Sequence, residues 1–288
     1  MEAEASRTAV LVCQARAVAD GRLAVGRFSD PFAIRLLQGD ERAPVERTRA
    51  SVRGPLWTDR VQDGMVAGTA TVLATRTVAI DDAVAEAGNP QLVLLGAGLD
   101  ARAYRLGHLA HATVFEVDHP LTQQAKRART EGLTPVAGAL TYVPVDFRHD
   151  SLAAALAEAG HDPDLPTTWI WEGVLPYLAA DAVASTLSVV EARSAPDSRL
   201  VATYSTSNAM ASIASCVFRA AARLFGARDP LENEPHVSAW SVREMRTLLE
   251  SNGFHIEDDR DMAKDAERLA IPTRRIAKHM GRVVVARR

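Results

Sequence analysis

The first residues that could do chemistry are two glycines and an aspartate. Gly96 and Gly98 follow the apolar run at 92–95, which reads as a strand buried on both faces. Two glycines with one small residue between them allow a sharp turn and a close approach of backbone to ligand. Asp118 ends the next predicted strand, where a carboxylate can accept both hydroxyls of a ribose. Strand, glycine turn, helix, strand and acid together predict a nucleotide site.

The glycine turn does not identify the nucleotide. Gly96 and Gly98 with Ala101 also fit a dinucleotide fingerprint, which accepts alanine at its last position. A nicotinamide-dependent dehydrogenase is therefore an alternative. Against it, no tyrosine in the chain has a lysine four positions later, so the pair typical of short-chain dehydrogenases is absent.

Further polar residues follow the other predicted strands. Asp146 and Phe147 end the strand at 140–145, and Glu172 ends the strand at 167–171. In open α/β sheets the ligand lies outside the carboxyl ends of the strands, so these residues and Asp118 should meet in one crevice. We expect Asp146 and Phe147 at an adenine, and Glu172 at a cationic part of the ligand. Each acid taken alone could instead cap a helix.

Two histidines are weaker candidates. His119 follows Asp118 and could touch the ligand, although packing or solvent exposure explains it better. His236 lies in a loop after the fifth predicted strand, where residues often reach substrate, and is a candidate general base. No histidine has metal-ligand spacing to another, so we expect no metal site.

Composition indicates a soluble globular α/β protein. The 288 residues carry a net charge of −3, which gives no reason to expect nucleic-acid binding. Two cysteines, Cys13 and Cys216, have no disulfide or metal spacing, so a reducing cytoplasm is the expected location. No apolar run is long enough for a membrane span, and the first residues are acidic where a signal peptide would be basic.

The chain divides into a helical part and an alternating part. Residues 1–89 are predicted to be helical and to form an N-terminal cap or lid. Within them, Gly64 and Gly68 should split or kink the helix at 59–87. Residues 90–288 alternate strands with helices, including an apolar helix at 207–224. This pattern predicts a doubly wound, mostly parallel sheet in one compact unit.

The motifs resemble those of one family. LVLLGAGLDARAYRL, followed by VFEVDHP, VDFR and WIWEGVLPYL, is similar over about residues 30–178 to the leucine carboxyl methyltransferases. That family includes the methyltransferases of the protein phosphatase 2A C-terminus and bacterial enzymes of secondary metabolism, among them polyketide carboxyl O-methyltransferases. The resemblance implies a class I S-adenosylmethionine-dependent fold, a Rossmann-like sheet of seven strands with the last strand antiparallel.

The resemblance also implies roles for individual residues. Arg76 would hold the methionyl carboxylate of S-adenosylmethionine, Glu172 would lie near its ammonium, and Tyr177 would be the aromatic residue beside the reacting centre. The other implied cofactor contacts fall on residues already singled out, namely Gly96 and Gly98 in the cofactor loop, Asp118 at the ribose, and Asp146 and Phe147 at the adenine. Phe147 stands where the family usually has leucine, and the C-terminal half matches only loosely.

We therefore expect an S-adenosylmethionine-dependent O-methyltransferase acting on a carboxylate of a small-molecule biosynthetic intermediate. A carboxylate is ionised at pH 7 and needs no base. A hydroxyl acceptor is the main alternative, with His236 or Tyr177 recruited as base. A dehydrogenase and a non-catalytic cofactor-binding protein are further alternatives. The expected partner is the small-molecule acceptor, with a homodimer possible and neither nucleic acid nor membrane.

Overall fold

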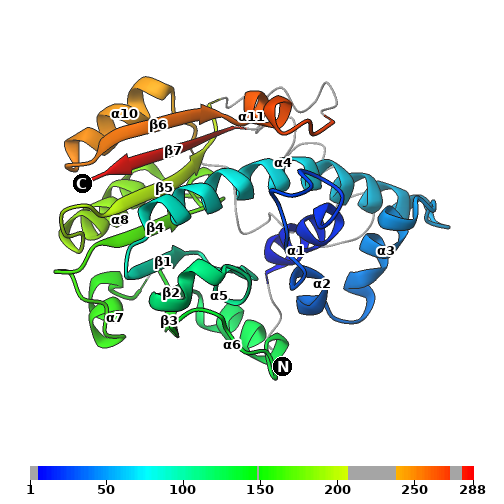
Figure 1. The fold of residues 1–288 in the computed structure, drawn as a ribbon, viewed down its shortest axis with the longest axis horizontal. Helices are drawn as coiled ribbons and strands as arrows, with labels where there is room; N and C mark the ends of the chain where they lie inside the picture. The colour runs from blue at the N-terminus through cyan, green and yellow to red at the C-terminus, as the bar shows by residue number, and fades with distance from the viewer. Residues whose placement is uncertain (1–5, 148, 207–237, 273–280) are drawn as a thin grey trace.

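A seven-stranded sheet occupies one half of the molecule, on the left in Figure 1, and the N-terminal helices α1, α2 and α3 lie on the right. The computed structural model describes residues 6–147, 149–206, 238–272 and 281–288. The helix predicted at 207–224 and the candidate base His236 therefore lie outside the described residues. The strands are β1 (Gln91–Leu95), β2 (Thr113–Asp118), β3 (Ala139–Pro144), β4 (Thr167–Trp171), β5 (Arg199–Tyr204), β6 (His255–Asp261) and β7 (Arg282–Arg287).

Helices flank this sheet and form most of the N-terminal region. The α-helices are α1 (Arg7–Ala19), α2 (Ala33–Leu36), α3 (Ala43–Ala50), α4 (Trp57–Ala87), α5 (Arg102–Arg105), α6 (Pro120–Arg129), α7 (Leu152–Glu158), α8 (Ala180–Ala192), α10 (Val242–Ser251) and α11 (Met262–Arg268). The described residues also form three short 3-10 helices, η1 (Gly39–Arg42), η2 (Gly107–His111) and η3 (Leu175–Tyr177). Within the described ranges, no helix is both long enough and apolar enough to cross a membrane.

The strand order confirms the predicted fold class. It runs β3-β2-β1-β4-β5-β7-β6, with β1 parallel to both β2 and β4, and β7 antiparallel to β5 and β6. The chain starts in the middle of the sheet, moves outward through β2 and β3, and then returns to the other side of β1 at β4. The connections after β1 and β4 therefore diverge, which opens a crevice at their carboxyl ends.

Both faces of the sheet are covered. Alternation along β4 directs Ile170 to one face, with Leu92, Leu94 and the helices α1 and α4. Trp169 and Trp171 face the other side, which is covered by α7, α8 and α10. Because both faces are buried, β1 and β4 carry no charged residue, and their polar residues, Gln91, Thr167 and Thr168, lie where the strands begin.

Helix α4 is continuous, so the break expected at its glycines is wrong. It runs for 31 residues through Gly64 and Gly68. Both glycines are exposed, and no other side chain or distant backbone lies within 4 Å of where their Cβ atoms would be. They cost intrinsic helix stability without disturbing any contact, and packing elsewhere on the helix outweighs that cost. The N-terminal half of α4 packs against α1 and α3, and its C-terminal half crosses the sheet (Figure 1).

One buried histidine makes the stability of this fold dependent on pH. The ring of His161 lies between the rings of Phe115 and Trp169, with centroid distances of 5.5 and 5.2 Å. Burial, together with the nearby charge of Arg193, lowers the pKa of His161 from 6.5 to about 4. The unfolded chain therefore takes up a proton at this position before the folded protein does.

We expect the protein to lose stability as the pH falls from 6.5 to 4, because protonation of His161 favours the unfolded state throughout that window. The loss should be on the order of 2 kcal/mol, measured as the free energy of unfolding in urea at several pH values. A His161→Gln variant keeps hydrogen-bonding groups but does not titrate, so its curve should be flatter. Parallel curves for the two proteins would assign the acid sensitivity to other groups.

Candidate active site

The turn after β1 requires glycine at its first position. Gly96 has φ +75°, and a Cβ built there would lie 2.6 Å from Cγ2 of Val174. The backbone N–H groups of Gly96 and Ala97 both donate to the carbonyl of Val117, at 2.9 and 3.0 Å, which holds the turn against β2. Gly98 has φ +49°, and its Cβ would lie 3.2 Å from the Cβ of Ala9. Helix α1 therefore packs directly over the turn.

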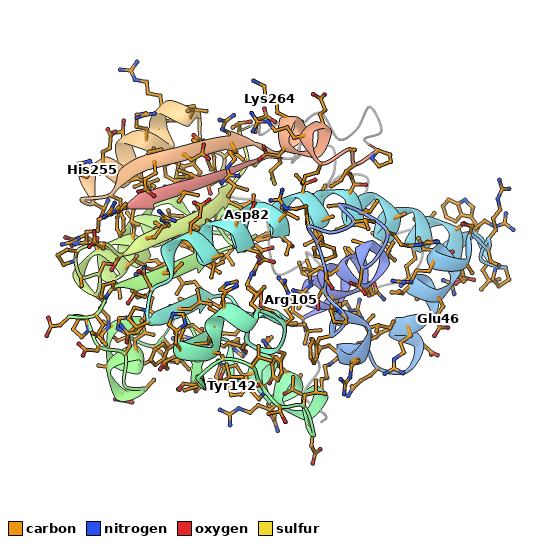
Figure 2. The ribbon with its side chains drawn as sticks, in the orientation of Figure 1. Glu46, Asp82, Arg105, Tyr142, His255 and Lys264 are labelled. Atoms are coloured by element: carbon orange, nitrogen blue, oxygen red, sulfur yellow. The ribbon has the colours of Figure 1, made fainter. Side chains whose placement is uncertain are left out.

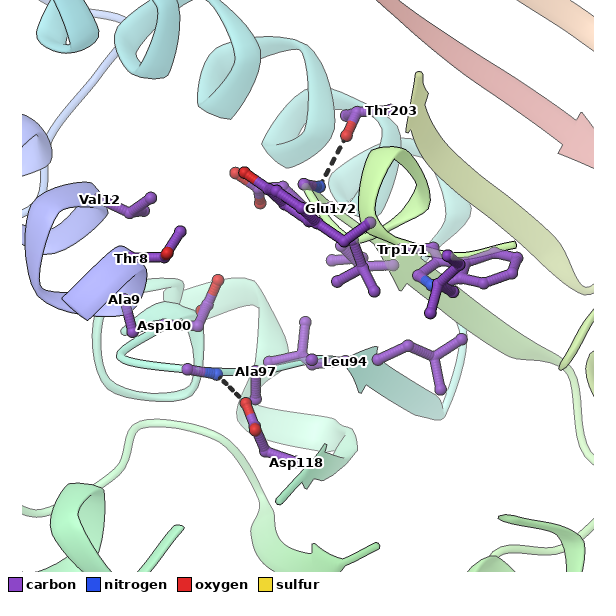
Figure 3. A pocket seen from close by; sticks show the side chains of 18 of the residues that line it. Thr8, Ala9, Val12, Leu94, Ala97, Asp100, Asp118, Trp171, Glu172 and Thr203 are labelled. Carbon is purple, nitrogen blue, oxygen red and sulfur yellow. Dashed lines mark hydrogen bonds between the residues drawn. The ribbon is translucent and has the colours of Figure 1, made fainter. Parts of the chain in front are cut away.

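Asp118 is fixed by two backbone hydrogen bonds. Its Oδ2 accepts from the N–H of Gly98 at 2.5 Å (Figure 3). Its Oδ1 accepts from the N–H of His119 at 2.7 Å. Burial raises the pKa of the Asp118 carboxyl, although these two hydrogen bonds oppose the shift. A carboxylate offers about four acceptor positions, so both oxygens retain capacity for ligand hydroxyls.

One cavity of about 850 Å³ collects the predicted site residues. It is bounded by the glycine turn, the ends of β2, β3 and β4, and the start of α1. Figure 3 shows Thr8 and Val12 on α1 facing Glu172 across this space. Among the residues predicted from the sequence, those lining it are Arg76, Gly96, Gly98, Asp118, His119, Asp146, Phe147, Glu172 and Tyr177.

Glu172 and two arginines form a cluster of opposite charges in the wall of the cavity. Nε of Arg76, on α4, donates to Oε1 of Glu172 at 2.7 Å, and Nη1 of Arg102 donates to Oε2 at 2.8 Å. Burial alone would raise the pKa of the Glu172 carboxyl, but Arg76 and Arg102 outweigh it and lower that pKa. Glu172 is therefore an anion at neutral pH, with one oxygen bound to each arginine.

Arg102 also belongs to a closed ring of alternating charges, which we call the charge ring. Each member interacts with the next, in the order Arg102, Asp100, Arg16, Asp30, Arg105, Asp81 and back to Arg102. Arg102 makes a close contact with Asp100, Arg105 lies 2.7 Å from Asp81, and Arg102 lies 2.8 Å from Asp81. The wider ones are 3.9 Å between Arg105 and Asp30 and between Arg16 and Asp100.

The charge ring joins segments that are far apart in the sequence. Arg16 comes from α1, Asp81 from α4, and Arg105 from α5; Figure 2 shows Arg105 between the sheet and the N-terminal helices. Asp30 accepts from the backbone N–H of Ala33 at 3.0 Å, so it also caps a short helix. Sequence reasoning did not identify the ring. The available signal was Arg102 and Arg105, two charges three residues apart within an apolar stretch.

The ends of β2 and β3 provide a different kind of surface. Nε2 of His119 lies 3.9 Å from Oδ2 of Asp146, beyond hydrogen-bonding distance. Phe147 lines the cavity and is 46% exposed. In the described part of the chain, no three His, Cys, Asp or Glu residues group so that they could hold a metal ion.

Comparison with known proteins decides the family. The model of the leucine carboxyl methyltransferase family matches residues 9–191. The chain belongs to the leucine carboxyl methyltransferase family. A relative from Frankia alni, provisionally named an S-adenosyl-L-methionine-dependent methyltransferase, is 39% identical over 204 residues, which cover 69% of this chain and 68% of the relative. This membership confirms the predicted resemblance, and the shared name of the relatives is that of S-adenosylmethionine-dependent methyltransferases.

Other relatives carry the same provisional name. One from Mycobacterium sp. (strain JLS) is 37% identical over 199 residues, or 68% of this chain. One from Mycolicibacterium smegmatis is 50% identical over 119 residues, or 41% of this chain. The matches span 65% and 37% of the lengths of these two relatives.

Solved structures show the same fold at low sequence identity. A DUF574 family protein from Streptomyces avermitilis has a TM-score of 0.60 and 14% identity, covering 100% of this chain and 99% of its own. Magnesium protoporphyrin IX methyltransferase from Synechocystis, solved with bound S-adenosylhomocysteine, has a TM-score of 0.50 and 17% identity, covering 85% of this chain and 93% of its own.

We expect Gly96→Ala to destabilise the protein by about 2–4 kcal/mol, because it combines left-handed backbone strain with overlap against Val174. Gly64→Ala is the matched control, since that exposed helical glycine should gain about 0.5–1 kcal/mol. Both are measured by urea unfolding. The cost of Gly96→Ala should shrink in a Val174→Ala background; an unchanged cost would leave backbone strain as its whole cause.

Proposed function

We propose that the protein is an S-adenosylmethionine-dependent O-methyltransferase whose acceptor is a carboxylate of a small-molecule biosynthetic intermediate. The observation that carries this proposal is one cavity with a ribose-type acid, Asp118, on one side and the opposed charges of Arg76 and Glu172 on another. The cation and the anion are complementary to the carboxylate and the ammonium of a methionyl group. Family membership supports the same reading.

The residues of the cavity fit this cofactor. The glycine turn leaves no room for a Cβ at Gly96 and presents backbone to the cavity. Asp118 would accept the ribose hydroxyls, and Asp146 with the exposed Phe147 would contact the adenine. Arg76 would bind the methionyl carboxylate and Glu172 the ammonium. When bound, the cofactor would supply a methyl group on a positively charged sulfur, which a nucleophile attacks in line.

The residues around the cavity favour an acceptor that is already ionised. Transfer to a hydroxyl needs a base hydrogen-bonded to the acceptor. In the described residues that line the cavity, His119 is the histidine present, and it is 3.9 Å from Asp146. A carboxylate needs no proton removed at neutral pH. The protein would then contribute orientation and exclusion of water, with Tyr177 beside the reacting groups.

The shape of the cavity favours a small acceptor over a protein chain end. Its volume of about 850 Å³ is within the range of small-molecule and cofactor sites, about 300–1,000 Å³. Helix α1 covers the glycine turn, and hydroxyl-bearing residues from two helices face the interior, among them Thr8 on α1 and Ser185 and Thr186 on α8. Such a wall can orient polar substituents of an otherwise apolar acid.

Arg76→Ala should weaken S-adenosylmethionine binding by about 10- to 100-fold, because a charge-assisted hydrogen bond contributes roughly 1.5–3 kcal/mol. Calorimetry measures the affinity. Arg27→Ala is the matched control, since Arg27 forms an exposed ion pair with Asp82 away from the cavity. Near-normal affinity of Arg76→Ala would make the arginine a structural partner of Glu172. Tight binding of NAD without binding of S-adenosylmethionine would instead favour the dehydrogenase.

Carboxylate transfer should have a rate that is flat from about pH 6 upward, because the acceptor is ionised well below that value. A panel of small organic acids and matched alcohols, followed by mass spectrometry, identifies the product. The expected product is a methyl ester that mild alkali hydrolyses. An alkali-stable methyl ether, formed at a rate that rises with the pKa of a base, would support the hydroxyl acceptor and leave the methyltransferase assignment intact.

A further inference from the structure

Arg102 is the member of the charge ring that also binds Glu172. Its side chain is 1% exposed. Nε donates to Oδ1 of Asp81 at 2.8 Å, and Nη1 donates both to Asp100 and to Oε2 of Glu172. The planar guanidinium is held by three carboxylates at once, so it has little freedom to turn. It therefore fixes the position of Oε2 of Glu172.

The two arginines on Glu172 differ in what else holds them. Arg76 donates to Oε1 of Glu172 from α4, and the ion pairs of the described residues include no second carboxylate for it. Arg102 is tied to Asp81 and Asp100 as well. A ligand carboxylate that recruits Arg76 would therefore leave Arg102 as the cation bound to Glu172.

We propose that Arg102 is a positioning residue for ligand binding: it holds Glu172 as an oriented anion for the ligand ammonium when Arg76 turns to the ligand carboxylate. The charge ring acts through Arg102 by fixing it in place. This inference rests on the proposed function, since it assumes a ligand with a zwitterionic methionyl group. It adds a residue that does not itself touch that group.

The charged groups around Glu172 determine how its pKa would respond to a change at Arg102. They are Arg76 from α4, Arg102 from α5, Asp100 from the glycine turn and, at longer range, Arg16 from α1. Burial and Asp100 raise the pKa of the Glu172 carboxyl, and the arginines lower it. Weakening the contact with Arg102 should therefore bring protonation of Glu172 closer to neutral pH, and a neutral Glu172 attracts an ammonium less.

The test compares Arg102→Lys with Arg105→Lys by calorimetry with S-adenosylhomocysteine at pH 8 and pH 6. A lysine at 102 keeps the charge but cannot reach three carboxylates. Arg105→Lys disturbs the same ring at Asp81 and Asp30 without touching Glu172. We expect Arg102→Lys to bind about tenfold more weakly at pH 6 than at pH 8, while wild type and Arg105→Lys change by less than about twofold.

Two further variants allow the inference to be contradicted even if Arg102→Lys is unstable. Adding Glu172→Gln to Arg102→Lys should abolish the pH dependence, because the titrating group is gone. Glu172→Asp, too short to reach both arginines, should acquire the pH dependence with the charge ring intact, even if Arg102→Lys proves unstable. Parallel pH profiles for wild type, Arg102→Lys and Glu172→Asp would overturn the inference. Failure of the wild type to bind S-adenosylhomocysteine would instead overturn the proposed function beneath it.

Discussion

The alternating charges buried between the N-terminal helices and the sheet are the constraint on which the site depends. Removing one partner of a buried ion pair typically costs about 3–5 kcal/mol, because the other charge stays buried and uncompensated. Replacing all partners by apolar residues can be neutral or stabilising. The charge ring is therefore better understood as a device for geometry than for stability. Its ion pairs fix Arg16, Asp81 and Arg102 relative to one another. Arg102 in turn holds Glu172, which lines the cavity.

Helix α4 gives this arrangement a rigid frame. One continuous helix carries Arg76 and Asp81 and packs against both α1 and the sheet. The residues that would bind the carboxylate and the ammonium of a methionyl group thus belong to different layers, Arg76 to the helix and Glu172 to the end of β4. Their meeting point is fixed by the packing of α4 on the sheet. Helix α1 supplies one wall of the cavity, and Arg16 and Arg76 supply part of its charge.

The parts of the site that depend on local chain order could be predicted from the sequence. Apolar runs ending in Gly96, Asp118 and Glu172 identified the strands and the edge where they meet, because parallel strands share one carboxyl edge. The charge ring depends on distant partners: 84 positions separate Arg16 from Asp100, and 75 separate Asp30 from Arg105. Nothing local specifies such pairs. The break expected in α4 at Gly64 was wrong for a related reason. Whether a helical glycine is exposed, as Gly64 is, depends on tertiary packing and not on the local sequence.

The contact between Ala9 and Gly98 restricts the size of the residues that these two positions can carry during evolution. A Cβ at position 98 would lie 3.2 Å from the methyl group of Ala9, so the helix and the turn approach as closely as two small residues allow. Enlarging residue 9 would push α1 away from the turn and stretch the contacts of Arg16. In an alignment of the family, these two positions should therefore covary in size. A relative with a bulkier residue at either one must hold its first helix differently and enclose a cavity of another shape.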